Sequence, residues 1–278
     1  MGRPQKKKRK PKSKLTAATA DRHVLYGLSV QNVEAEIDFV DETFKHLRGR
    51  DAKSLREDFC GTANSAAEWV KRREDNLAIG VDLDTETLEW ARAHTLPALA
   101  EEQQARVTLL ERDVRDPGPE GIGCDIVLAM NFSYWLLNKR DDLVAYFRSV
   151  RESLGPDGLF FLDHYGGSDA LTETTEDREL DGFTYVWDQD KYDPISGMMT
   201  AYIHFKFPDG TKMKKAFAYH WRHYTLPEVQ DCLRDAGFAK VTVYWEGEDD
   251  DGEGDGVFSP AEEGDADPAF ITYIVAQP

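Results

Sequence analysis

The sequence predicts a doubly wound α/β fold, and three observations support this prediction. Between residues 54 and 166, short apolar stretches alternate with segments whose apolar residues recur at helical spacing. LAIGVDLD (77–84) is almost continuously apolar, as is typical of a parallel strand that is buried on both faces. LREDFCGTA (55–63) reads as a strand, a tight turn with a glycine and the start of a helix. Such a turn lets the backbone approach a ligand closely, and the new helix offers it unpaired N–H groups.

The first half of the chain is expected to alternate strands and helices in a regular order. The first predicted helix carries apolar residues at Val33, Ile37, Val40, Phe44 and Leu47, which is helical spacing. The predicted helices cover 33–47, 64–73, 85–100 and 140–154, and the predicted strands cover 55–60, 77–84, 107–110, 125–130 and 159–167.

The pattern changes after about residue 170. Residues 183–187, 198–207 and 213–221 alternate apolar and polar side chains, and the turn sequences DPISG and PDG separate them. They predict an antiparallel β meander that is inserted into the α/β frame at about residues 170–222. The frame then resumes with a helix at 225–236 and with strands at 239–245 and 269–276. We therefore expect residues 23–278 to form one domain with an inserted subdomain.

The net charge of −18 conceals two segments of opposite sign. Residues 3–14 are almost all basic or helix-breaking, whereas residues 246–267 concentrate Asp and Glu among glycines. Both segments are poor in apolar residues, so we expect a disordered basic tail at 1–22 and a solvated acidic loop at 246–268. The tail is either a solubilising arm or a weak contact to nucleic acid through residues 3–14, and the acidic body argues against tight duplex binding.

The three cysteines, Cys60, Cys124 and Cys232, lie far apart and lack metal-ligand spacing. Neither a disulfide framework nor a metal site is therefore expected. No apolar run approaches membrane-spanning length, and no apolar signal core follows the basic start of the chain. The sequence predicts a cytoplasmic protein without membrane contact, and it gives no indication of the oligomeric state.

Four features follow the predicted parallel strands, at the edge where ligands bind in open α/β sheets. These features are 57–63, Asp82, Asp113 with Val114, and 131–135. Asp82 follows the glycine turn by about twenty residues, which is the interval at which an acid accepts hydrogen bonds from a ribose diol. Together the four features predict a nucleoside-containing cofactor.

The chain resembles class I S-adenosylmethionine-dependent methyltransferases in the order of its motifs, which are LREDFCGTA, AIGVDLD, ERDVRDP, DIVLAMNFSYWL, LGPDGLFFLDHYGG and YTLPEVQDCLRDAGF. The resemblance covers roughly residues 25–278. It implies a Rossmann-like sheet of seven strands whose last strand is antiparallel. The meander after the fifth strand is similar to the small-molecule N-methyltransferase branch, such as the amino-sugar and glycine-type enzymes.

By position, this resemblance implies a site for S-adenosyl-L-methionine. Asp82 and Leu83 would lie at the ribose, Asp113 with Val114 would face the adenine, and Asn131 would lie near the reactive sulfonium. The methionine part would lie against the turn, formed by Glu57, Phe59, Cys60, Gly61, Thr62 and Ala63. Phe59 and Ala63 stand where this family commonly has glycine, so Phe59 must turn away from the cofactor or pack against it.

Methyl transfer from a sulfonium is an in-line displacement, which needs an aligned nucleophile more than an elaborate catalytic group. A general base is needed only if the acceptor arrives protonated. His164 and Tyr165, at the end of the fifth strand, are the best-placed candidates, and His220 and His223 come next. For each histidine a structural, hydrogen-bonded role is equally compatible with the sequence. The aromatic residues that could face a cationic centre are Tyr134, Trp135, Trp187 and Trp221.

The resemblance implies transfer to a nitrogen or oxygen of a small-molecule acceptor, and two other functions remain open. The basic tail would suit an RNA or protein substrate, and a cofactor-binding module without catalysis is the other alternative. A nicotinamide dehydrogenase is disfavoured because the sequence contains no G-x-G-x-x-G. The acidic loop is either solvated or, together with the meander, rims the entrance, where its negative field would favour a cationic amine.

Overall fold

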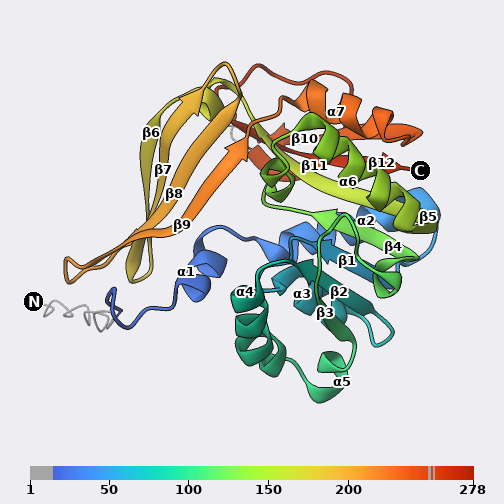
Figure 1. The fold of residues 1–278 in the computed structure, drawn as a ribbon, viewed down its shortest axis with the longest axis horizontal. Helices are drawn as coiled ribbons and strands as arrows, with labels where there is room; N and C mark the ends of the chain where they lie inside the picture. The colour runs from blue at the N-terminus through green and yellow to red at the C-terminus, as the bar shows by residue number, and fades with distance from the viewer. Residues whose placement is uncertain (1–14, 250–251, 253) are drawn as a thin grey trace, which may run out of the picture. The chain divides into compact units, whose positions relative to one another are not determined.

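The computed structural model describes residues 15–249, 252 and 254–278 (Figure 1). The chain forms two compact units. The small unit contains the described part of Met1–Val30 together with Glu173–Tyr192 and Met199–His220, and the large unit contains Gln31–Thr172, Asp193–Met198 and Trp221–Pro278. The basic segment 3–14 lies outside the described residues.

The large unit is built on an eight-stranded sheet with the order β11-β10-β12-β5-β4-β1-β2-β3 (Figure 1). Strands β1 to β5 pair in parallel, and β12 runs antiparallel to both of its neighbours, β5 and β10. The predicted α/β sheet with an antiparallel last strand is thereby confirmed. The strand bounds are Ser54–Asp58 (β1), Leu77–Asp82 (β2), Val107–Glu111 (β3), Cys124–Ala129 (β4), Leu154–Gly166 (β5), Lys240–Glu248 (β10), Gly254–Ala261 (β11) and Phe270–Gln277 (β12).

The eighth strand, β11, lies within the segment 246–268 that we expected to be an acidic loop. It pairs antiparallel with β10 and forms the edge of the sheet. Phe258 anchors it, because its ring centroid lies 4.6 Å from that of Tyr273 and 6.1 Å from that of Phe39. The sheet therefore has one strand more than the seven that we predicted. The acidic composition of the segment concealed Phe258, the apolar residue that anchors the additional strand.

Helices cover both faces of this sheet. Phe160 and Phe161 are neighbours in β5 and point to opposite faces. Phe161 belongs to the core beneath α2 and α3, whereas the Phe160 ring lies 5.7 Å from Phe147 of α6 and 5.9 Å from Phe238. The helix bounds are Val33–Arg48 (α2), Asn64–Arg72 (α3), Thr85–Trp90 (α4), Glu101–Gln104 (α5), Arg140–Ser153 (α6) and Leu226–Asp235 (α7).

Several short helical turns connect these elements. The predicted helix 85–100 is divided, because α4 passes into a π-helical turn and then into a 3₁₀ turn that contains Pro97. Proline lacks the N–H that an α-helix would need at this position. The short turns are Ala91–Thr95, Leu96–Ala98, Pro119–Gly121, Ser133–Leu136 and Ser168–Leu171.

The small unit contains a four-stranded sheet with the order β6-β7-β8-β9. It confirms a separate sheet after the fifth strand, and it adds β6, whose TTEDREL sequence is too polar to be recognised. Helix α1 (Arg22–Ser29) and Leu15, Ala17 and Ala20 pack on its apolar side, so part of the predicted tail 1–22 is ordered. The strand bounds are Thr174–Leu180 (β6), Phe183–Asp193 (β7), Met198–Lys206 (β8) and Lys212–Arg222 (β9).

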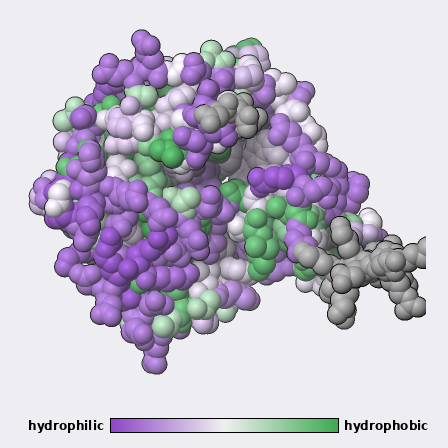
Figure 2. All heavy atoms as spheres, turned by 180° about the vertical axis from the view of Figure 1, so that it is seen from behind, coloured by the Kyte–Doolittle hydropathy of each residue, from purple (hydrophilic) through white to green (hydrophobic). Residues whose placement is uncertain are grey.

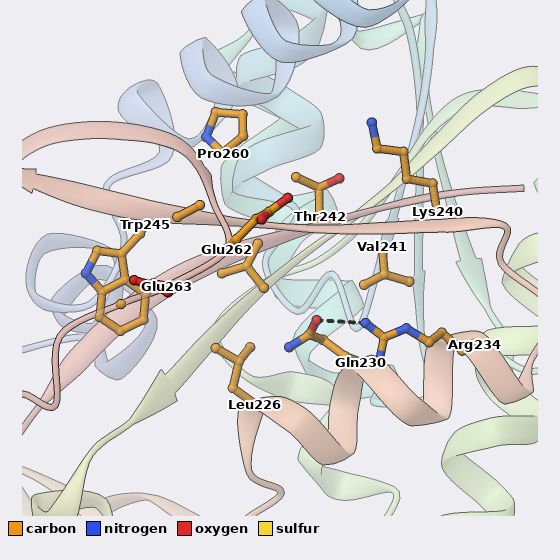
Figure 3. Close-up of a pocket in the computed structure, with 13 residues that line it drawn as sticks. Leu226, Gln230, Arg234, Lys240, Val241, Thr242, Trp245, Pro260, Glu262 and Glu263 are labelled. Carbon is orange, nitrogen blue, oxygen red and sulfur yellow. Dashed lines mark hydrogen bonds between the residues drawn. The ribbon is translucent and has the colours of Figure 1, made fainter.

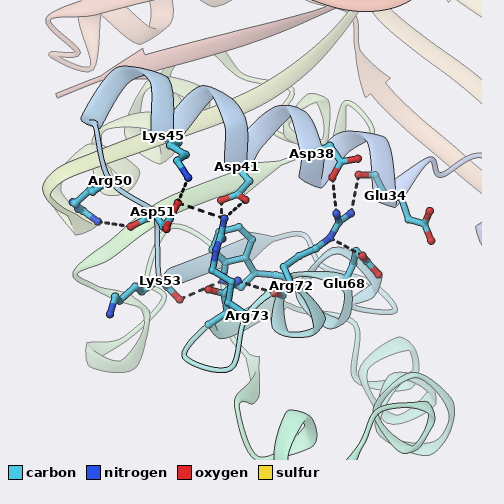
Figure 4. A network of polar contacts seen from close by, with 12 residues as sticks. Glu34, Asp38, Asp41, Lys45, Arg50, Asp51, Lys53, Glu68, Arg72 and Arg73 are labelled. Carbon is cyan, nitrogen blue, oxygen red and sulfur yellow. Dashed lines mark hydrogen bonds and ion pairs between the residues drawn. The ribbon is translucent and has the colours of Figure 1, made fainter.

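Ion pairs hold α2 against α3 at the outside of the large unit (Figure 4). Arg72 of α3 places one nitrogen 2.6 Å from the Asp38 carboxylate and donates another hydrogen bond to the Glu34 carbonyl. Arg73 makes two hydrogen bonds to Asp41, of 2.9 and 2.5 Å. Exposed pairs of this kind contribute only about 0.2–1 kcal/mol each. Geometrically, they join α2 to the C-terminal end of α3.

No helix in the described part of the chain has both the length and the apolar character needed to cross a bilayer. Hydrophilic residues cover most of the face drawn in Figure 2. Large apolar side chains that are more than two fifths exposed include Ile195 and Leu83, which lie apart from each other, and Val24 and Leu28, which lie one turn apart on α1. Single exposed apolar residues need no partner to explain them.

Candidate functional site

The carboxyl ends of β1 to β5 lie at one edge of the sheet, because these five strands are parallel. Open α/β sheets bind ligands at this edge. The turn 59–63 follows β1, Asp82 ends β2, Asp113 follows β3, and 130–132 follows β4. The structure thus brings the predicted strand-end residues to one edge of the large unit.

The turn 59–63 is built from left-handed residues. The φ angles of Phe59, Gly61 and Ala63 are 54°, 50° and 56°. A non-glycine residue in this conformation costs roughly 1–2 kcal/mol, so the surrounding contacts must enforce it. The Phe59 ring packs edge-on against Tyr146 of α6, with their centroids 5.5 Å apart. Phe59 therefore turns toward α6, and Ala63 precedes α3 as a left-handed N-cap.

Asp82 ties the end of β2 to this turn. Its Oδ2 accepts a hydrogen bond of 2.7 Å from the Gly61 N–H, and its Oδ1 accepts one of 2.9 Å from the Asp84 N–H. A carboxylate has about four lone-pair sites, so this geometry leaves acceptor capacity for two further donors such as a vicinal diol. Leu83, beside it, is 66% exposed.

The close contact between β2 and the turn depends on Gly80. A Cβ atom at this position would lie 2.8 Å from the Cys60 Sγ and 2.9 Å from Leu109. Such distances are shorter than ordinary van der Waals contact, so a larger residue would push the turn away from β2. Cys60 is itself buried, and Thr62 accepts a hydrogen bond of 2.8 Å at its carbonyl from the Thr95 hydroxyl.

Asp113 is engaged by a neighbouring guanidinium. Arg115 donates hydrogen bonds from Nη2 (2.6 Å) and Nε (3.0 Å) to its carboxylate, and the Arg115 N–H donates another of 2.9 Å. These bonds lower the pKa of Asp113. Val114 is buried. A ligand amino group at Asp113 would therefore share the carboxylate with Arg115.

Asp163 of β5 is a site residue that the sequence analysis missed. The N–H groups of Asn131 and Phe132 donate hydrogen bonds of 2.7 and 2.9 Å to its two carboxylate oxygens. Both donors are left-handed, with φ of 57° and 55°. Burial raises the pKa of Asp163 to about 7, although these two hydrogen bonds act in the opposite direction. The sequence feature that could have identified Asp163 is an acid within the apolar run LFFLDH.

Glu57 is the corresponding buried acid of β1. Its Oε2 accepts a hydrogen bond of 2.8 Å from the Ala66 N–H in the first turn of α3. The side chain is almost inaccessible, and burial raises its pKa to about 8. Glu57 therefore fixes the beginning of α3, although its buried surroundings disfavour the ionised form of its side chain.

Glu36 of α2 was also missed. Its Oε2 is buried and, within the described part of the chain, accepts no hydrogen bond. Burial raises the pKa of Glu36, and its charge in turn raises the pKa of both Glu57 and Asp163. The sequence feature that could have identified Glu36 is its position, since it lies at helical spacing from Val33 and Val40 on the apolar stripe of its helix.

His164 lies in the core rather than at an open surface. Its side chain is fully buried, and its Nδ1 is 2.9 Å from the Tyr134 hydroxyl oxygen. Because Asp163 and His164 are consecutive in β5, they point to opposite faces of the sheet. Burial lowers the pKa of His164 to about 3, so the ring is neutral at pH 7. This geometry corresponds to the structural role that the sequence left open for His164.

The other candidate bases and aromatic residues occupy different places. His223 is buried, with its ring 6.3 Å from that of His164, and the Tyr165 ring lies 5.9 Å from Phe132. His220, in the small unit, is exposed with Nδ1 at 3.4 Å from the Thr200 hydroxyl oxygen. Among the aromatic candidates, Tyr134, Trp135 and Trp221 are buried in the large unit. Trp187 packs within the small unit.

Neutral His164 should make the folded state sensitive to acid. Its folded-state pKa, about 3, is below the ordinary value of 6.5, so the unfolded chain binds one more proton between these values. Stability from this group is present above pH 6.5 and is lost as pH falls, by up to about 1.4 kcal/mol per pH unit. We expect His164→Asn, which does not titrate, to unfold with a shallower pH dependence between pH 4 and 6.5.

Urea unfolding at a series of pH values checks this prediction. His46→Asn is the matched control, because His46 is exposed on α2. The raised pKa values of Glu57 and Asp163 affect the stability of the fold in the opposite direction, because their contribution is lost as pH rises. We expect this contribution to be the same in all three proteins. Equal slopes for wild type and His164→Asn would contradict a neutral buried His164.

A groove of about 580 Å³ lies elsewhere in the large unit, between α7 and β10 (Figure 3). Leu226 and Gln230 of α7 form one wall, and Lys240–Val243 at the start of β10 form another. The groove continues along β10 to Trp245 and is closed by residues 260–264.

No protein-family model and no curated protein sequence matches this chain. Solved structures do match. An S-adenosylmethionine-dependent methyltransferase from Clostridium acetobutylicum has a TM-score of 0.67 at 18% identity, covering 92% of this chain and 96% of the other. The CcbJ methyltransferase from Streptomyces caelestis has a TM-score of 0.67 at 17% identity, covering 90% and 98%. CalS10, an amino pentose methyltransferase from Micromonospora echinaspora solved with bound cofactor, has a TM-score of 0.64 at 15% identity, covering 92% and 96%.

These likenesses extend over nearly the whole length of both chains. They show that the protein has the Rossmann-like fold of these methyltransferases. Identities below one fifth leave the chemistry to be argued from the residues of this chain.

Proposed function

We propose that the protein is an S-adenosyl-L-methionine-dependent methyltransferase that acts on a small-molecule acceptor. One observation carries the proposal: Asp82, at the end of β2, is hydrogen-bonded to the left-handed turn after β1 and retains acceptor capacity at the ligand-binding edge of the sheet. The shared fold with proteins named as methyltransferases supports the same reading. The amino pentose in the name of CalS10 makes amino sugars the first acceptors to test.

The residues of the site fit the chemical groups of this cofactor. S-adenosylmethionine carries a ribose diol, a cationic sulfonium, and an amino-acid end with a cationic α-ammonium and an anionic α-carboxylate. Asp82 would accept from the ribose hydroxyls, with Leu83 beside it, and Asp113 with Val114 would face the adenine. Glu36, whose buried oxygen has no hydrogen-bond donor in the described residues, supplies an anionic partner for a cation. The methionine part would lie along Glu57, Phe59, Cys60, Gly61, Thr62 and Ala63, with Asn131 near the sulfonium.

Bound S-adenosylmethionine would supply an electrophilic methyl group. The contribution of the chain is then to orient the donor and to exclude water, because an in-line displacement depends chiefly on alignment. The turn 59–63 and the turn 130–132 are held by Asp82 and Asp163 and so present preformed walls. An amine acceptor that arrives neutral needs no general base, which agrees with the buried, neutral state of His164.

A labelled-methyl assay with the full chain tests the proposal. We expect S-adenosylmethionine to bind in calorimetry and label to enter an amine among amino sugars and small amines. Label in RNA or protein, lost when residues 1–14 are deleted, would favour a macromolecular substrate. Binding without transfer to any fraction of a cell extract would favour a cofactor-binding module. Failure to bind S-adenosylmethionine would overturn the proposal.

A further inference from the structure

We propose that Thr95 is a positioning residue that acts through Thr62: its hydroxyl holds the Thr62 carbonyl, which keeps the N–H and hydroxyl of Thr62 in place for the α-carboxylate of the methyl donor. This role rests on the proposed function, which places the methionine part of the donor along the turn 59–63. Thr95 ends the short π-helical turn Ala91–Thr95 that follows α4. Its Oγ1 donates a hydrogen bond of 2.8 Å to the Thr62 carbonyl oxygen.

Thr62 is the residue of this turn whose donors remain free. The N–H groups of Cys60, Gly61 and Ala63 each donate a hydrogen bond of 2.7–3.1 Å within the protein. Neither the N–H nor the hydroxyl of Thr62 has a partner in the part of the chain that the structure describes, although Thr62 is only 7% exposed. Because buried N–H groups are nearly always paired, a ligand that supplies an acceptor would explain this pair of donors.

The chemistry of the methyl donor indicates which of its groups is the acceptor. The Thr62 N–H can only donate a hydrogen bond, and the ammonium and sulfonium of the methionine part are cations that do not accept one. The α-carboxylate accepts from both N–H and O–H groups, and such charge-assisted bonds are stronger than neutral ones. Thr62 therefore suits the α-carboxylate.

Two hydrogen bonds to other elements bracket the peptide group that carries the Thr62 N–H. On its N-terminal side, the Gly61 N–H donates to Asp82 at 2.7 Å, and on its C-terminal side the Thr62 carbonyl accepts from Thr95. The peptide group between Thr62 and Ala63 also donates from the Ala63 N–H to the Cys60 carbonyl, but this bond stays within the turn. The Thr95 hydroxyl therefore ties this side of Thr62 to a different part of the fold.

The π-helical turn leaves the Thr95 hydroxyl available for this contact. Thr95 follows Leu88 by seven residues, and it therefore lies on the side of the helix that Leu88 and Ala91 bury in the core. A threonine hydroxyl within a helix often donates to the carbonyl four residues before it. Here the Ala91 carbonyl accepts the Leu96 N–H instead, and the Thr95 hydroxyl reaches out of the helix. Turns of this kind are rare and occur frequently at functional sites.

Calorimetry with S-adenosylmethionine and its decarboxylated analogue tests this role. The analogue keeps the adenosine, the ammonium and the sulfonium and lacks the α-carboxylate. For wild type at neutral pH we expect the analogue to bind about tenfold more weakly. Thr95→Val removes the hydroxyl and keeps the shape of the side chain. It should weaken S-adenosylmethionine by about fivefold and the analogue by less than about twofold.

Two variants control for a general effect on the fold. Thr95→Ser retains the hydroxyl and should restore the affinity for S-adenosylmethionine to within about twofold of wild type. Thr85→Val is the matched control, because the Thr85 hydroxyl donates a hydrogen bond of 2.8 Å to Glu111 at the other end of this helical segment. Both valine variants should lower the melting temperature of the ligand-free protein by similar amounts, and only Thr95→Val should change the ratio of the two Kd values.

Thr62→Val gives an independent measurement if Thr95→Val does not fold. It removes the hydroxyl that would meet the α-carboxylate, so it too should weaken S-adenosylmethionine more than the analogue. Equal weakening of both ligands by either variant, or a Thr95→Ser protein that binds as weakly as Thr95→Val, would overturn the role of Thr95 and leave the proposed function intact. Failure of wild type to bind S-adenosylmethionine would overturn both.

Discussion

Asp58→Ala is expected to lower the free energy of unfolding by about 3–5 kcal/mol, because it leaves a guanidinium buried without its counter-charge. Arg56 and Asp58 are both inaccessible in β1. The Arg56 Nε lies 2.9 Å from Asp58 Oδ1, and Nη2 donates a hydrogen bond of 3.0 Å to Oδ2. The Tyr146 hydroxyl donates to the same Oδ2 at 2.9 Å. The pair is thus enclosed beneath the turn that follows β1.

The loss should exceed that from removing the whole pair. Arg56→Met with Asp58→Leu removes both charges and fills the space, and such replacements of a buried pair are often neutral or stabilising. Urea unfolding of Asp58→Ala, the double variant and Tyr146→Phe separates the contributions, with Tyr146→Phe losing about 1 kcal/mol for one hydrogen bond. A loss below about 1 kcal/mol for Asp58→Ala would show that Arg56 finds water or another partner.

This pair also illustrates what a sequence can and cannot predict. LREDF was recognisable as a strand from its position before a glycine turn, but the charges of Arg56 and Asp58 suggested exposed polar positions. Their burial depends on the carbonyl of Gly121 and the hydroxyl of Ser153, which accept hydrogen bonds from Arg56 at 2.6 and 2.8 Å. These partners lie 65 and 97 residues further along the chain. Local periodicity carries no information about contacts at that separation.

The candidate site also contains some positions that the sequence could predict and others that it could not. The position of Asp82 beside the turn could be predicted, because the turn and the acid lie at the ends of adjacent parallel strands. Asp163 looked like one polar residue within an apolar strand, and Glu36 looked like one of several acids on an amphipathic helix. The contact of Asp163 with the 131–132 turn is evident only in the folded chain. His164 shows the converse, since a strand-end histidine that suggested catalysis faces the core.

Asp82→Ala is expected to weaken S-adenosylmethionine binding by about a hundredfold. Hydrogen bonds to a charged acceptor are worth about 1.5–3 kcal/mol each, and a ribose diol would lose two of them. The variant also frees the Gly61 N–H, which now donates to Asp82 at 2.7 Å, so the turn loses its tie to β2. Because 1.4 kcal/mol corresponds to a tenfold change, even two weak bonds account for the predicted loss.

Two further variants separate recognition of the ribose from support of the turn. Asp82→Asn retains one acceptor oxygen for the Gly61 N–H but loses the charge, so we expect an intermediate loss of affinity with a nearly unchanged melting temperature. Asp84→Ala removes the N-cap of α4, whose carboxylate accepts from the Thr87 N–H at 3.0 Å, and should cost about 1 kcal/mol of stability with little change in Kd. If Asp82→Ala bound S-adenosylmethionine as tightly as Asp84→Ala does, Asp82 would only support the turn, and the strand-end acid would no longer be evidence for a nucleoside site.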